Sequence, residues 1–216
     1  MPSYSLLATT LLISGCAGLA LSHSITDLEF IHAEDGILES LQAILLGCAA
    51  FCFLLVSSVA SRGIQRLEYL GLTLLCFSFV LREVDLETWD LPSLLTQLVV
   101  GNGRTVTLLI LWLGLFAFVA RAFDLTRLSS IRHLVRRQIA NGFVAYLSVA
   151  ALLLVAGGVL DRELFEVRHF QFWEEFLETH AYLLLLLLAL RQARLHRRGA
   201  ALRPAQNPVA VEVASD

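Results

Sequence analysis

Long apolar stretches alternate with short charged connections along most of this chain. The apolar stretches cover residues 6–21, 37–60, 67–81, 105–120, 139–160 and 172–191. A helix needs about 20 mostly apolar residues to cross the hydrocarbon core of a bilayer, which is about 30 Å thick. Soluble domains average about 45–50% apolar residues, whereas this chain is 57% hydrophobic. The pattern predicts an all-α fold, a membrane bundle of about six transmembrane helices.

The charged residues in the connections are sorted by sign. Arginine fills every second connection, as at Arg62 and Arg66, and carboxylates such as Asp27 and Asp161 fill the others. An excess of Arg in short loops marks the cytoplasmic side of a membrane. Both the N and the C terminus are therefore predicted to be cytoplasmic, and the acidic side is predicted to face outward.

The first apolar stretch, residues 6–21, leaves alternatives open beside a plain membrane helix. A signal peptide usually begins with a positive residue, and Met1–Ser5 contain none. The segment Ile13-Ser14-Gly15-Cys16 resembles a lipoprotein cleavage box, although the apolar run continues beyond Cys16. The sequence favours a helix and does not decide whether Cys16 is a lipidation site.

Two of the predicted helices cannot cross the membrane without including charged residues. Residues 67–81 cover only about 22 Å at 1.5 Å per residue, less than the hydrocarbon thickness. To cross, this helix must carry Arg82, Glu83 and Asp85 into the outer part of the membrane. The last helix, counted back about 20 residues from its basic end at Arg191, must include Glu174, Glu175, Glu178 and His180.

These acids, together with those that begin the second helix, form a candidate site for a ligand or cation. A carboxylate at membrane depth costs at least about 2.5–3.5 kcal/mol, so it should face the protein interior or water and have a partner. One arginine cannot neutralise four or more acids, so the others should be protonated, hydrated or paired with a cation. Tyr182 continues the helix face of Glu178, and Gln42 lies one turn below Glu39. The candidate site residues are Glu34, Asp35, Glu39, Arg82, Glu83, Asp85, Glu174, Glu175, Glu178 and His180.

The Glu and His side chains of this set could hold a divalent metal ion, and the sequence does not identify any cofactor further. However, the chain has no Glu-x-x-His di-iron pair and no His-Glu-x-x-His motif. Glu178 and His180 are two positions apart, which places them about 200° apart around a helix. The four cysteines lie within apolar stretches and are interpreted as packing residues. No glycine-rich phosphate loop and no nucleic-acid-binding pattern is present.

The remaining segments are predicted to lie at the membrane surface or in water. Residues 124–138 predict a basic amphipathic helix that would rest on anionic lipids of the inner leaflet, each Arg contributing about 1 kcal/mol. This helix would act as a simple topology anchor or, alternatively, recognise specific lipids. Residues 86–103 predict an outer connection that lies flat on the bilayer or dips into the bundle. The chain divides into a six-helix transmembrane domain, residues 1–198, and a disordered cytoplasmic tail, residues 199–216.

Three short acidic motifs carry a family resemblance. The Glu34-Asp35-Gly36-x-x-Glu39 motif, the Phe-x-x-Arg-Glu-x-Asp motif that begins at Phe79, and the Glu174-Glu175-x-x-Glu178 motif together resemble those of uncharacterised bacterial multi-pass integral membrane proteins. That family has no assigned activity. The resemblance therefore implies only a location, the cell inner (cytoplasmic) membrane, and a multi-pass helical architecture.

Three functions fit these patterns. The first is an outward-facing intramembrane carboxylate pocket that binds or transports a cation, a proton or a cationic small molecule. The second is a membrane-embedded, metal-dependent hydrolase that acts near the outer-leaflet headgroups. The third is a non-catalytic structural or partner-binding membrane subunit. The sequence leaves open whether the chain is an enzyme and whether it forms an oligomer.

Overall fold

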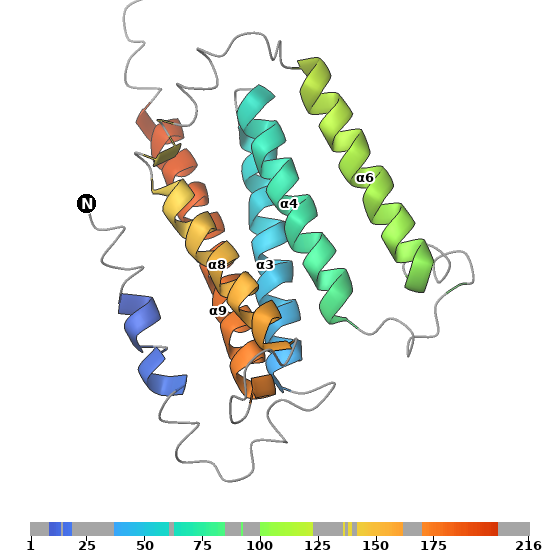
Figure 1. The fold of residues 1–216 in the computed structure, drawn as a ribbon. Coiled ribbons are helices and arrows are strands. Elements are labelled where there is room, and N and C mark those ends of the chain that lie inside the picture. The colour runs from blue at the N-terminus through green and yellow to red at the C-terminus, as the bar shows by residue number, and fades with distance from the viewer. Residues whose placement is uncertain are drawn as a thin grey trace, which may run out of the picture.

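The computed structural model describes most of the apolar part of the chain and is all-helical there (Figure 1). A short helix spans Thr9–Gly18. Five longer helices follow: α3 (Ile37–Val59), α4 (Gly63–Glu83), α6 (Gly101–Ala122), α8 (Phe143–Asp161) and α9 (Phe170–Leu202). The described residues are 9–13, 15–18, 37–60, 63–84, 92, 100–122, 136, 138–139, 142–161 and 170–202. The prediction of an all-α fold is confirmed for these residues.

Three of the described helices are long and apolar enough to cross a membrane. These are Leu38–Val59 in α3, Phe143–Leu160 in α8 and Phe170–Arg197 in α9. Two shorter apolar helices, Thr9–Gly18 and Gly101–Ala117, accompany them. The chain thus has the composition and helix lengths of a membrane protein.

The helices are arranged as two antiparallel pairs that share a common centre (Figure 1). α3 packs against α4, α8 packs against α9, and α3 and α9 run side by side in the same direction. α6 lies at the edge and packs against α4. α3 and α9 therefore begin at the same end of the bundle at which α4 and α8 finish. This topology brings the acidic ends of α3, α4 and α9 together, and it brings the arginine-rich ends together at the opposite end.

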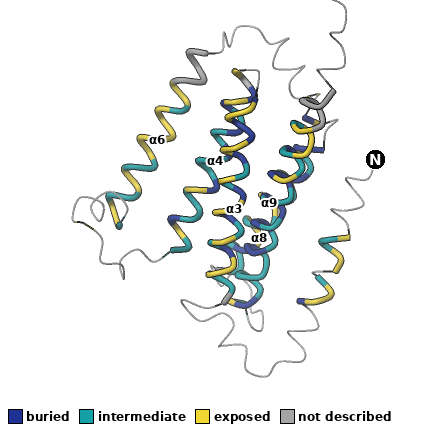
Figure 2. The backbone as a smooth tube through the Cα atoms, turned by 180° about the vertical axis from the view of Figure 1, so that it is seen from behind, coloured by how far each residue is buried: buried dark blue, intermediate teal, exposed yellow. Residues whose placement is uncertain are grey.

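The core lies between α3, α4, α8 and α9, and apolar side chains also cover the outside. On α3, Leu46, Ala49 and Phe53 are fully buried, and their three- and four-residue spacing defines the buried face of this helix, from which Phe53 stacks on Tyr69 of α4. On the outside of α3, Ile44 and Phe51 are 62% and 61% exposed. Figure 2 shows the same alternation of buried and exposed positions along the helices. Large exposed apolar patches mark surfaces that contact a membrane or another protein.

The helix boundaries differ from the apolar stretches in ways that matter for the charged residues. α4 begins at Gly63 and ends at Glu83, so it includes both Arg82 and Glu83 as regular helical residues. α9 continues to Leu202, beyond the predicted tail boundary at residue 198. Arginine and alanine are good helix formers, so the basic segment can extend the helix beyond its apolar part. Residues 22–36, most of 124–138 and the tail from residue 203 onward lie outside the described residues.

A close approach between α8 and α9 occurs at Gly157. A Cβ atom at this position would lie 3.3 Å from Cγ of Glu178 and 3.5 Å from the carbonyl oxygen of Glu174. At the neighbouring Gly158, a Cβ atom would meet nothing within 4 Å. Gly157 therefore allows α8 to lie directly against the part of α9 that carries the acids.

This difference predicts unequal effects for two neighbouring substitutions. Gly157→Ala and Gly158→Ala should gain similar helix propensity, but only the first crowds Glu178. We expect the Gly157→Ala protein to unfold with a free energy lower by about 1 kcal/mol than that of Gly158→Ala, since overpacking costs about 1–3 kcal/mol. Denaturation of both proteins in detergent micelles measures the difference. Equal stability of the two variants would show that α8 does not press on Glu178.

Candidate functional site

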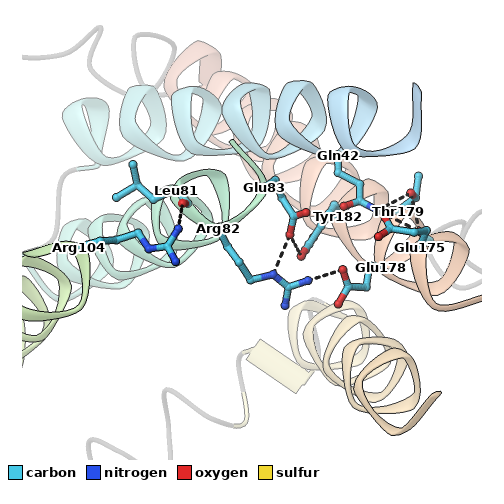
Figure 3. A network of polar contacts seen from close by, with 9 residues as sticks. All are labelled: Gln42, Leu81, Arg82, Glu83, Arg104, Glu175, Glu178, Thr179 and Tyr182. Carbon is cyan, nitrogen blue, oxygen red and sulfur yellow. Dashed lines mark hydrogen bonds and ion pairs between the residues drawn. The ribbon is translucent and has the colours of Figure 1, made fainter. Parts of the chain in front are cut away.

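Arg82, in the last turn of α4, connects two buried carboxylates (Figure 3). Its Nε donates to Oε1 of Glu83 at 3.0 Å, and its Nη2 donates to Oε2 of Glu178 on α9. The side chains of Glu83 and Glu178 are only 6% and 4% exposed, whereas that of Arg82 is 49% exposed. Two carboxylates thus leave water together and share one guanidinium group at the surface of the bundle.

Tyr182 supplies a second donor to Glu83. Its hydroxyl donates to Oε1 of Glu83 at 2.9 Å, and its ring centre lies 5.6 Å from that of Phe79 on α4. Tyr182 lies four positions after Glu178, on the same face of α9. This face therefore offers α4 a carboxylate and a phenol, one of which accepts from Arg82 while the other donates to Glu83.

Glu175 lies on the part of α9 that faces α3, and its described contacts are all with neutral groups. Nε2 of Gln42 donates to its Oε2 at 2.5 Å and to its carbonyl oxygen at 3.1 Å. The Thr179 hydroxyl donates to the same carbonyl oxygen at 2.7 Å, and lies 3.2 Å from Nε2 of Gln42. Gln42 is fully buried, and its Oε1 has no hydrogen-bond partner among the described residues. Glu175 thus differs from Glu83 and Glu178, which contact Arg82.

We call these seven residues the carboxylate network: Gln42, Arg82, Glu83, Glu175, Glu178, Thr179 and Tyr182. Figure 3 shows that its side chains come from three helices and point toward one another. Toward the arginine-rich end, the next buried side chains are apolar, with Leu46 on α3, Cys76 on α4 and Leu185 on α9 at 0–2% exposure. A packed layer of these apolar side chains, which we call the apolar floor, therefore separates the network from the arginine-rich end.

The structure brings together four of the predicted site residues, Arg82, Glu83, Glu175 and Glu178. Glu39 and Glu174 are half-buried at the same end of the bundle. Glu39 is one turn before Gln42, and Glu174 contributes its carbonyl oxygen to the close approach at Gly157. Of the remaining predicted residues, Glu34, Asp35 and Asp85 lie outside the described residues.

His180 does not join the carboxylates. Its Nδ1 lies 2.5 Å from the carbonyl oxygen of Phe176, and its ring centre lies 4.2 Å from that of Phe176. The ring is therefore held on its own helix, as its two-residue offset from Glu178 implies. Sequence reasoning did not single out Thr179, although its four-residue offset from Glu175 is the spacing at which a threonine hydroxyl reaches a helix carbonyl.

Metal-binding side chains do not gather in the part of the chain that the structure describes. Within those residues, no group of three or more His, Cys, Asp or Glu side chains is arranged to hold a metal ion. All four cysteines are free, and only Cys76 is buried. The carboxylate network combines acids with an arginine, an amide and hydroxyls.

No family model, no curated protein and no solved structure matches this chain. The resemblance of its acidic motifs to uncharacterised bacterial membrane proteins stays a prediction.

The shared guanidinium predicts energetic coupling between α4 and α9. Arg82→Gln leaves Glu83 and Glu178 without a positive partner, so this variant should be destabilised more when Glu178 is present than when it is replaced. We expect a coupling free energy of about 1–3 kcal/mol from the cycle of Arg82→Gln, Glu178→Gln and the double variant, as for residues in one polar network. Unfolding of the four proteins in detergent micelles measures it. Strictly additive effects would mean that the two side chains do not interact.

Proposed function

We propose that the chain is a multi-pass protein of the bacterial inner (cytoplasmic) membrane, and that the carboxylate network is an outward-facing intramembrane site that binds or transports a cation, a proton or a cationic small molecule. The proposed topology has six membrane helices, with both termini cytoplasmic. Three apolar helices of spanning length support it. The Thr9–Gly18 helix, α4 and α6 supply the other three. The proposed orientation follows from the arginine-rich connections, because an excess of Arg in short loops marks the cytoplasmic side of a membrane.

The charge balance of the network is the observation that carries the proposal. Glu83, Glu175 and Glu178 bring three carboxylates to one place, and Arg82 is the one guanidinium that contacts them among the described residues. If all three were ionised, two negative charges would remain uncompensated in a site from which water is largely excluded. Ions at membrane depth are costly unless they are paired. A proton or a bound cation is what would balance the network.

Glu175 is the acid best placed to take up the proton or contact the cation that balances the network. Arg82 satisfies Glu178 and, with Tyr182, satisfies Glu83, whereas Glu175 relies on neutral donors. Gln42 suits both states of Glu175, because an amide carries donors on nitrogen and an acceptor on oxygen. Its NH₂ group donates to the carboxylate. A rotated amide would accept from a protonated Glu175. Oε1, which has no hydrogen-bond partner among the described residues, would be available to contact a cation.

The network's position favours entry of the ligand from the acidic side. The half-exposed Arg82 side chain lies at the edge of the site, and an apolar floor separates the site from the arginine-rich end. Arg82 would serve as a fixed internal counter-charge that keeps the net charge low when no ligand is bound. Movement of a ligand across the membrane would require the floor to open, so binding is the simplest form of this proposal.

Charge uptake by purified protein tests the proposal. We expect Glu175→Gln to abolish proton uptake after a pH jump, measured with a pH-sensitive dye, together with binding of sodium or tetramethylammonium measured by calorimetry. Glu68→Gln is the matched control, because it removes the same charge from a half-buried acid at the other end of α4 and should leave uptake intact. Infrared spectra should show a protonated-carboxyl band in the wild-type protein without cation that Glu175→Gln removes.

Two results would contradict the proposal. One is equal uptake of protons and cations by the wild-type, Glu175→Gln and Glu68→Gln proteins. The other is a wild-type protein that binds no cation while its infrared spectrum shows every carboxyl group ionised at neutral pH. The network would then be a structural connection between helices.

A further inference from the structure

A second site candidate lies at the arginine-rich end, far from the carboxylate network. A cavity of about 400 Å³ lies between the last two turns of α3 and the basic part of α9. Cys52, Leu55 and Val59 line it from α3, and Leu190 lines it from α9. Arg194 and Arg197 form its polar edge. This volume is within the range of about 300–1,000 Å³ that is usual for small-molecule sites.

Among the described residues, Arg194 and Arg197 have no protein partner, whereas two nearby arginines do. Arg66 donates from Nε to the carbonyl oxygen of Ser57 at 3.2 Å, and the guanidinium of Arg191 lies 5.8 Å from the centre of the Tyr146 ring. Arg194 and Arg197, by contrast, are exposed and make no hydrogen bond or ion pair with any residue that the structure describes. They are three positions apart and so share one face of α9.

Contacts of His196 and Gln192 stabilise the part of α9 that lines the groove. His196, which also lines the cavity, places its Nδ1 3.1 Å from the carbonyl oxygen of Gln192. Its ring lies edge-on to Tyr69, at 5.4 Å between ring centres, and the Tyr69 hydroxyl donates to Oε1 of Gln192 at 3.1 Å. These contacts fix the turn of α9 that carries Arg194 and Arg197. The two guanidinium groups are thus presented by a rigid element.

The chemistry of the groove selects an amphiphilic anion. Guanidinium groups match the geometry of phosphate oxygens, whereas Leu55 and Val59 offer apolar walls that are 50% and 68% exposed. The apolar wall runs along α3 from Cys52 to Val59, a length of about 10 Å, and leads from the membrane interior to the end of the helix. A ligand with a phosphate group at one end and a hydrocarbon chain at the other would fit both parts of the groove. A phospholipid in the leaflet on the arginine-rich side has this chemistry.

We infer that this groove binds one anionic phospholipid, with its phosphate on Arg194 and Arg197 and part of an acyl chain along Cys52, Leu55 and Val59. The residues that line this site lie on α3 and α9, and the inference does not depend on the function proposed for the carboxylate network. A lipid seated here would join α3 to the extended end of α9.

Lipid retention by the full-length protein tests the inference. Native mass spectrometry in detergent should show one phosphatidylglycerol bound to the wild-type protein and much weaker binding of phosphatidylcholine with the same acyl chains. The double variant Arg194→Gln/Arg197→Gln should bind phosphatidylglycerol about thirty-fold more weakly, because each arginine near an anionic lipid surface contributes a factor of about five. Arg66→Gln is the control, since this exposed arginine lies at the same end but already donates to Ser57.

A second pair of variants tests the apolar wall without changing any charge. Leu55→Trp should fill the groove and weaken phosphatidylglycerol binding, whereas Leu54→Trp, at an exposed neighbouring position outside the groove, should not. The inference is overturned if phosphatidylcholine binds as well as phosphatidylglycerol, or if the double arginine variant and Arg66→Gln bind phosphatidylglycerol equally. It is also overturned if glycerol phosphate, which has no acyl chain, competes as strongly as the lipid, or if Leu55→Trp binds like Leu54→Trp.

Discussion

A carboxylate that leaves water needs a positive partner or a proton, and this requirement organises the acidic end of the bundle. Glu83 ends α4 and Glu178 lies within α9, and both are almost fully buried. Arg82 reaches both of them from α4. α3 packs against both α4 and α9. The polar contacts of Arg82 with Glu178 and of Tyr182 with Glu83 connect α4 directly to α9. The Tyr69–Gln192 hydrogen bond makes a corresponding connection between the same helices at the opposite end.

The two ends of the molecule have different chemical capacities. At the acidic end, carboxylates outnumber guanidinium groups, and Gln42 and Thr179 surround Glu175 with neutral hydrogen-bonding groups. At the arginine-rich end, Arg194 and Arg197 lie beside an apolar groove without described protein partners. The packed side chains between these ends, such as Leu46 and Leu185, keep the two sites apart. The topology thus gathers helix ends of like charge, with acids at one end of the bundle and arginines at the other.

The all-helical fold of the described residues could be predicted from the sequence, because long apolar stretches favour helices. A helix that must cross about 30 Å of hydrocarbon has to include the charged residues at its ends, and α4 and α9 include Arg82, Glu83 and Glu178. The spacing of Tyr182 and Gln42 indicates their faces correctly. The pairing of side chains is less accessible from sequence, because it depends on how the helices are rotated against one another. The close approach at Gly157, the contact of Gln42 with Glu175 and the position of His180 against Phe176 all depend on that packing.

The distance between the Arg82 guanidinium and the Glu178 carboxyl group in a lipid bilayer tests the central claim most directly. Solid-state NMR of full-length protein, with ¹⁵N in the arginine side chains and ¹³C in the glutamate carboxyl groups, measures this distance through the dipolar coupling between the two nuclei. The account predicts strong coupling of Nη2 of Arg82 to a glutamate carboxyl carbon, which disappears in Glu178→Gln, whereas the coupling of Nε to the Glu83 carboxyl group remains. A weak coupling of Nη2 that is the same in both proteins would show that the acids are solvated separately and that no shared site exists.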